Sequence, residues 1–187
     1  MLRYRDGDAR AFEALYARHK GALYRYFLRQ TGSAIGEELF QDVWMNVIRT
    51  RERYEARAKF STWLYRLAHN RLIDHYRRTA ARVPVSYDSD TNETLLESVP
   101  DQPFREPDSE LERRRLAQRL LAALAALPEA QREVFLLREE GGLSLEEIAA
   151  VTDSNLEAAK SRLRYALAKL RLELASVFEP RRVHDGN

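Results

Sequence analysis

Residues 144–171 read SLEEIAAVTDSNLEAAKSRLRYALAKLR, and this stretch indicates the fold more clearly than any other part of the sequence. Ser144 and Glu147 have the spacing of a capping box, which predicts the start of a short helix. A turn over residues 152–155 separates this helix from a last helix, expected over residues 156–177. Two helices joined by such a tight turn form a helix-turn-helix unit.

The second helix of this unit has an apolar face and a basic face. The positions expected to point inward are Leu156, Ala159, Leu163, Ala166, Leu167 and Leu170. The other face carries Lys160, Ser161, Arg162, Arg164 and Tyr165. Residues 160–171 hold five basic residues and no acidic residue. Because such a helix fits the major groove of DNA, the unit is predicted to bind duplex DNA.

Helical periodicity also covers most of the remaining sequence. The whole chain of 187 residues has only seven Gly and six Pro, which favours helices over a turn-rich fold. One apolar stripe spans residues 12–27, a second follows a predicted N-cap at Ser33, and a third begins near Ser61 or Thr62. Further helices are expected over residues 110–127, where Pro128 stops the helix, and 129–139, where Gly141 and Gly142 follow. The sequence therefore predicts an all-α protein.

Charge divides the chain into blocks. Residues 1–80 carry 16 basic and 9 acidic residues, whereas residues 82–110 carry 2 basic and 8 acidic residues and four of the six Pro. Acidic, Pro-rich composition does not support a packed core. We therefore expect two small helical domains, residues 1–81 and 111–178, joined by a flexible acidic linker over 82–110 and followed by a tail over 179–187.

The segment from Arg49 to Arg78 combines nine basic residues and three acidic residues with interleaved aromatic residues. Cations and aromatic rings together suit unstacked bases of single-stranded nucleic acid. Aromatic residues at helical spacing are also typical of a core, so both interpretations stay open for this segment.

Several classes of protein are not indicated. The chain has no Cys, which excludes disulfides and thiol chemistry. Its four His residues lack ligand spacing, and the acidic group Glu37, Glu38 and Asp42 has no nearby His, so no metal, cofactor or catalytic residue is predicted. The longest apolar run, residues 120–127, is too short to span a membrane. We expect a cytoplasmic protein that is not an enzyme.

Five stretches, in their order and spacing, resemble the extracytoplasmic-function (ECF) sigma factors, a minimal group of the bacterial sigma-70 family. They are EELFQDVW at 37–44, FSTWLYRLAHN at 60–70, LPEAQREVF at 127–135, LSLEEIA at 143–149 and KSRL at 160–163. The resemblance covers about residues 7–79 and 111–172. It implies a sigma-2-like helical bundle followed by a sigma-4-like helix-turn-helix domain.

The resemblance also implies partners and site residues. The first domain would bind the β′ clamp helices of core RNA polymerase and the minus-10 element of promoter DNA; the second would bind the β flap and the minus-35 element. The implied polymerase contacts are Glu37, Glu38, Leu39, Gln41 and Asp42. The implied minus-10 contacts are Lys59, Phe60, Ser61, Thr62, Trp63, Arg66, His69, Asn70, Arg77 and Arg78, with Asn70 matching the pocket for a flipped base. The implied minus-35 contacts are Lys160, Ser161, Arg162, Arg164 and Tyr165.

The sequence departs from the family pattern in two places. Ile35 stands where many members have Asp, so one negative charge is missing beside the polymerase-facing motif. Since a weakened acidic motif accompanies threonine phosphorylation in some groups of the family, Thr50 is a candidate site for a Ser/Thr kinase. Asp153 stands where helix-turn-helix turns often have Gly, and Ala158 where the family often has Thr. Asp tolerates the left-handed backbone region, so the turn is expected to form.

The predicted function is therefore that of an ECF sigma factor, which directs core polymerase to specific promoters under the control of an anti-sigma factor or of phosphorylation. One alternative is a helix-turn-helix regulator that binds duplex DNA without polymerase, in which case the Arg49–Arg78 segment is structural. A small nuclease using Glu37, Glu38 and Asp42 is a third class, which divalent-metal-dependent nicking would reveal.

Overall fold

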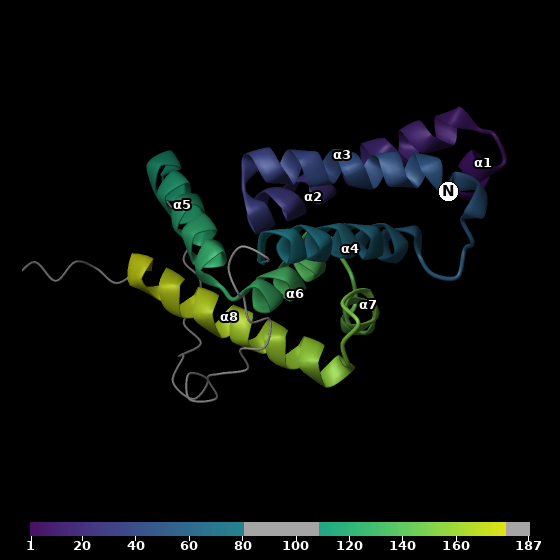
Figure 1. Ribbon diagram of the computed structural model, residues 1–187. Helices are drawn as coiled ribbons and strands as arrows, with labels where there is room; N and C mark the ends of the chain where they lie inside the picture. The colour runs from purple at the N-terminus through teal and green to yellow at the C-terminus, as the bar shows by residue number, and fades with distance from the viewer. Residues whose placement is uncertain (81–108, 179–187) are drawn as a thin grey trace, which may run out of the picture.

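The computed structural model describes residues 1–80 and 109–178, and every regular element within these two ranges is a helix (Figure 1). The first half contains α1 (Leu2–Arg5), α2 (Ala9–Thr31), α3 (Ser33–Arg49), the short 3₁₀ helix η1 (Arg51–Arg53) and α4 (Phe60–Ala80). The second half contains α5 (Glu110–Ala126), α6 (Glu129–Glu139), α7 (Leu145–Val151) and α8 (Leu156–Phe178). The predicted all-α class is confirmed. Nearly all of the predicted linker and the whole tail lie outside the described residues.

Most predicted helix boundaries agree with the structure to within one residue. Helix α6 has the predicted bounds, and Ser144 and Glu147 form both hydrogen bonds of the capping box. The predicted N-cap at Ser33 is wrong. Ser33 is the first residue of α3, and the cap is Gly32, whose φ of 82° redirects the chain between α2 and α3.

The first half is a bundle in which α2 packs on α3 and α3 packs on α4. Its fully buried side chains include Leu23 and Phe27 of α2, Leu39 of α3 and Leu64 of α4. Gly36 is buried where α3 crosses α2, and a Cβ there would lie 3.0 Å from the backbone nitrogen of Leu28. The absence of a side chain at this position lets the two helices approach closely.

The second half is built around α8, against which α5, α6 and α7 all pack. Ala123, Leu124 and Leu127 form a buried cluster with Ala166 and Leu170 of α8. One expected inward position is wrong: Leu167 is 37% exposed, because it lies at the edge of the face that α8 buries.

The two halves pack against each other, a contact that the sequence does not predict. Helix α7 lies against α4, and α6 and α5 lie against α2 (Figure 1). One continuous cluster of buried apolar residues joins them, with Tyr26 and Tyr65 from the first half and Leu137, Leu143 and Ile148 from the second. None of the described helices is both long enough and apolar enough to cross a membrane.

Candidate nucleic-acid interface

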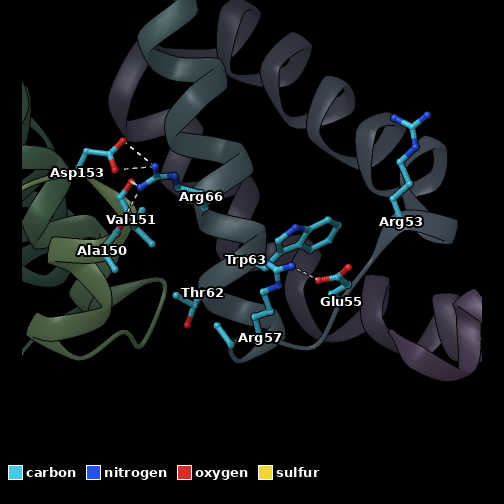
Figure 2. A pocket seen from close by; sticks show the side chains of 10 residues that line it. Arg53, Glu55, Arg57, Thr62, Trp63, Arg66, Ala150, Val151 and Asp153 are labelled. Atoms are coloured by element: carbon cyan, nitrogen blue, oxygen red, sulfur yellow. Dashed lines mark hydrogen bonds and ion pairs between the residues drawn. The ribbon is translucent and has the colours of Figure 1, made fainter.

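An open cavity lies at the N-terminal end of α4, where the loop that follows η1 enters the helix (Figure 2). It has a volume of about 630 Å³. The first half of the chain contributes Arg53, Glu55, Arg57, Ala58, Thr62, Trp63 and Arg66 to its wall. The second half contributes Ala150, Val151 and Asp153. Three guanidinium groups and an indole ring around one open cavity form a surface on which bases can stack and phosphates can pair.

Arg66 links this cavity to the turn of the helix-turn-helix unit. Its guanidinium donates to both carboxylate oxygens of Asp153, at 2.6 and 2.7 Å, and to the backbone carbonyls of Ala150 and Val151 at the end of α7 (Figure 2). Asp153 has the expected left-handed conformation, with a φ of 50°. One guanidinium nitrogen, Nη2, thus contacts both carboxylate oxygens, and the other, Nη1, donates to the two carbonyls. Such charge-assisted hydrogen bonds are also the kind that arginine makes to phosphate.

Glu147 connects the same two halves one helical turn away. Its Oε1 accepts from the hydroxyl of Thr62 at 3.0 Å and pairs with Nζ of Lys59 at 3.1 Å, while its other oxygen completes the capping box with Ser144. The pKa of Glu147 is lowered, chiefly because the backbone N–H of Ser144 donates to it, and further because Lys59 and Thr62 contact it. The capping carboxylate thus also pairs with Lys59, which precedes α4, and accepts a hydrogen bond from Thr62 in the first turn of α4.

A buried polar contact lies further along α4. Oε1 of Glu133, on α6, lies 2.7 Å from Nδ1 of His69 and accepts from the hydroxyl of Tyr26 at 2.8 Å. Glu133 is 2% exposed and His69 is 7% exposed. Nearby, Arg25 and Arg29 both pair with Glu140. The pKa of Tyr65 is raised, first by burial and then by the Glu140 carboxylate.

The exposed basic surface of α8 is the second candidate site. Lys160 and Arg164 are exposed, whereas Ser161, Arg162 and Tyr165 are half-buried. The Arg164 guanidinium lies 5.4 Å from the centre of the Tyr165 ring. Asn155 begins the helix by accepting a hydrogen bond from the backbone N–H of Ala158 at 2.7 Å. A capped helix with protruding cations has the form that enters a major groove.

Comparison with known proteins agrees with these features. The family described as Sigma-70 region 2 matches residues 15–82, and Sigma-70, region 4 matches residues 117–170. RNA polymerase sigma factor CarQ of Myxococcus xanthus is 34% identical over 183 residues, which cover 94% of this chain and 99% of CarQ. ECF RNA polymerase sigma factor SigF of Caulobacter vibrioides is 33% identical, covering 91% of this chain and 89% of SigF.

This chain belongs to the sigma-70 family, as an ECF RNA polymerase sigma factor. The solved structures agree on the fold. Sigma factor RpoE in complex with the anti-sigma factor NepR from Bartonella quintana has a TM-score of 0.66 at 23% identity, covering 89% of this chain and 98% of that one. CnrH in complex with the cytosolic domain of CnrY has a TM-score of 0.63 at 24% identity, covering 92% of both chains.

In this sigma factor, the predicted minus-10 residues of region 2 fall into two groups, according to whether they contact region 4. Lys59, Thr62, Arg66 and His69 all contact region 4. Within the described residues, the others form no hydrogen bond or ion pair with a region 4 side chain: Phe60, Ser61, Trp63, Asn70, Arg77 and Arg78. Asn70 is exposed and does not line the cavity. Its predicted role in a base pocket stays a prediction.

The predicted polymerase-facing residues lie on α3, and one of them needs a correction. Glu37, Glu38 and Gln41 are exposed, and Asp42 pairs with Arg71 of α4 at 3.3 Å. Leu39 is 1% exposed and belongs to the core of region 2, so it holds the helix in place and offers no surface to a partner.

Several residues of the interface were not predicted from the sequence. Arg53 and Arg57 line the cavity, and Glu133, Glu147 and Asp153 supply the carboxylates that region 4 presents to region 2. The arginines are part of the basic Arg49–Arg78 segment, which was a usable signal. The carboxylates gave none, because each stands in a helix-cap, turn or helix pattern that explains it locally. Within the described ranges no group of acidic or His side chains could hold a metal ion.

Proposed function

We propose that region 2 of this sigma factor binds the minus-10 element at the cavity beside α4, and that region 4 reads the minus-35 element with the exposed face of α8. The observation that carries the proposal is the cavity itself, whose wall Arg53, Arg57 and Arg66 share with the indole of Trp63. Its cations suit the DNA backbone, and the ring suits an unstacked base. Lys160 and Arg164 protrude from α8, as readers of base edges and phosphates must.

The acidic face of α3 is the proposed contact for the β′ clamp helices of core polymerase. Glu37, Glu38 and Gln41 are exposed together on this helix, so they present negative charge to a basic partner. Region 4 is the proposed contact for the β flap. The protein acts in the cytoplasm, where its polymerase is, and has no catalytic activity of its own.

An anti-sigma factor is the proposed regulator. Two solved proteins with a similar fold were determined in complexes: sigma factor RpoE with the anti-sigma factor NepR, and CnrH with the cytosolic domain of CnrY. Phosphorylation at Thr50 stays a separate prediction. Thr50 is half-buried at the end of α3, and its hydroxyl donates to the carbonyl of Asn46 at 2.8 Å.

Transcription in vitro tests the function. The purified protein is mixed with bacterial core polymerase and fragmented DNA from its host, and the run-off transcripts are sequenced. Discrete starts preceded by one shared pair of elements are expected. Arg164→Ala is expected to reduce these starts about ten-fold or more, because one arginine–guanine contact contributes about 1–3 kcal/mol of discrimination. Arg113→Ala removes an exposed cation from α5 and serves as the matched control.

Other results would separate the alternatives. Duplex binding without any polymerase association would instead favour a helix-turn-helix regulator. Polymerase binding without starts would point to a missing activation step, which the same assay examines with Thr50→Glu and Thr50→Ala. Equal polymerase affinity of these two variants would remove Thr50 as the switch.

A further inference from the structure

Four side chains that the family resemblance assigns to promoter DNA instead contact region 4: Lys59, just before α4, and Thr62, Arg66 and His69 of α4. Lys59, Thr62, Arg66 and His69 follow one another at intervals of three or four residues, which places them along one face of the helix. Region 4 meets this face with three carboxylates: Glu147 contacts the first two side chains, Asp153 the third and Glu133 the fourth. In this closed arrangement the α4 face is occupied by acidic groups of the same chain.

The pair between Arg66 and Asp153 is the part of this contact that most resembles bound DNA. Four acceptor atoms of region 4 surround the Arg66 guanidinium: two carboxylate oxygens and the carbonyl oxygens of Ala150 and Val151. Both Arg66 and Asp153 line the open cavity (Figure 2). Because carboxylate and phosphate oxygens both accept charge-assisted hydrogen bonds from a guanidinium, Asp153 occupies the position that a DNA phosphate paired with Arg66 would need.

The helix-turn-helix unit itself does not require the Asp153 carboxylate. Helix α8 is capped by the side chain of Asn155, and the end of α7 is closed by the backbone N–H of Ser154, which donates to the carbonyl of Ala149 at 3.0 Å. Glycine adopts the φ of 50° observed at this position at least as readily as aspartate does. In the described part of the chain, the hydrogen bonds and ion pairs of the Asp153 carboxylate all go to Arg66.

We propose that Asp153 is an internal competitor of promoter DNA, which holds region 4 over the minus-10 surface by occupying Arg66. The inference rests on the proposed function of the α4 cavity. Free sigma factor then keeps the minus-10 surface covered, and DNA gains access only when region 4 moves away. The side chains of Arg66 and Asp153 are 36% and 69% exposed, so their pair is weak enough for polymerase or DNA to displace.

The equilibrium between the closed and the open arrangement can be measured directly. Since the chain has no Cys, Met45→Cys on α3 and Leu172→Cys on α8 give two specific sites for a fluorescent donor and acceptor. Both positions are exposed, at 46% and 53%, and neither belongs to the proposed DNA surfaces. Single-molecule energy transfer then reports the closed and open populations in this labelled protein.

Three substitutions are compared in the labelled protein. Asp153→Gly removes the carboxylate and suits the left-handed backbone, and Asp153→Asn removes only the charge. Glu139→Gln removes one exposed carboxylate of α6 and serves as the control for net charge. Affinity is measured for a mixed-sequence DNA single strand of about 12 nucleotides, a length within the site sizes of single-strand-binding folds.

Both Asp153 variants are expected to raise the open-to-closed ratio and the affinity for the single strand about two- to five-fold, the range typical of a partly exposed ion pair. Glu139→Gln is expected to change neither quantity. Unchanged populations in both Asp153 variants would overturn the proposal, and so would opening without a gain in DNA affinity beyond the control. The run-off assay is independent of these outcomes. If starts persist while the populations do not move, the competitor role fails and the promoter function stands. If neither polymerase binding nor starts are found while the populations shift, the promoter function fails, and the Asp153–Arg66 pair is a contact between the two regions without a role in competing with promoter DNA.

Discussion

Glu133 is the most enclosed charged residue that the structure describes, at 2% exposed. It lies between the two regions, and a single oxygen contacts both His69 and Tyr26. A buried carboxylate needs such partners, because an unpaired one would keep the full cost of leaving water. At the scale of single residues, Glu133 therefore ties the stability of region 4 to its position on region 2.

Glu133→Ala is expected to lower the free energy of unfolding by about 1–3 kcal/mol, because His69 and Tyr26 lose a buried hydrogen-bond partner. Urea unfolding followed by circular dichroism measures this loss. Glu133→Gln keeps an acceptor oxygen and should lose less, and Glu139→Ala, on the exposed side of the same helix, should change stability little. An equal loss for the two alanine variants would show that the buried contact is not what stabilises the protein.

Single residues were predictable from the sequence where local backbone rules decide their role. The capping box of Ser144 and Glu147 and the left-handed Asp153 are of this kind, because neighbours in the chain fix their geometry. Glu133 was not, since a glutamate in a helix has the same sequence pattern on a solvated face and at a domain contact. Leu39 belongs both to the apolar stripe of its helix and to the acidic motif, so its sequence position alone did not decide between the core and a partner surface. The folded chain decides for the core at Leu39 and shows that Glu133 contacts side chains of region 2.

At the scale of helices, the approach of α3 to α2 depends on Gly36. The sequence suggested only a lost negative charge near this position, whereas the structure shows a backbone crossing. A Cβ at Gly36 would lie 3.0 Å from the nitrogen of Leu28 and 3.1 Å from the carbonyl carbon of Phe27. Both atoms belong to the backbone of α2, so neither can rotate away.

Gly36→Ala is therefore expected to destabilise region 2 by about 1–2 kcal/mol, because the two helices must separate and the overlap outweighs the higher helix propensity of alanine. Gly21→Ala on α2 is the matched control. Its new methyl group would meet only the end of the flexible Arg25 side chain, so a gain of about 0.5–1 kcal/mol is expected. Thermal unfolding of both variants compares the two effects, and a gain at both positions would show that the helices do not need the close crossing.

Helices themselves were largely predictable, because apolar periodicity and end signals operate within one segment. The bounds of α6 and the start of α5 at Glu110 agree with the sequence. The errors lie where a neighbouring helix decides the outcome. Gly32 rather than Ser33 caps α3 because the chain must reverse after α2, and Leu167 stays exposed because α8 buries a narrower face than its pattern indicates.

At the scale of the whole molecule, the packing of region 4 on region 2 could not be predicted from the sequence. Tyr65 and Leu137 take part in a core that crosses from one region to the other, yet each also fits the apolar stripe of its own helix. A stripe shows that a face is buried, without showing what covers it. The closed arrangement therefore emerges only from the three-dimensional structure.

The size of the DNA surface limits what this sigma factor does alone. Opening about ten base pairs costs on the order of 10 kcal/mol, at roughly 1.4 kcal/mol per step. The cavity beside α4 offers one indole, Trp63, and stacking contributes about 1–3 kcal/mol per base. In the closed arrangement Arg66 is also paired with Asp153. Part of the free energy of DNA binding must therefore offset the cost of breaking this pair.

Promoter melting is therefore expected only with core polymerase, even for the Asp153→Gly variant, because removing one weak ion pair changes the balance by far less than the melting cost. Permanganate footprinting on a promoter mapped by run-off transcription measures this, since unpaired thymines react. Reactive thymines are expected with polymerase and sigma factor together, and none with either sigma variant alone. Reactivity with the free Asp153→Gly protein would mean that region 2 supplies much more binding energy than its one indole and three cavity arginines account for.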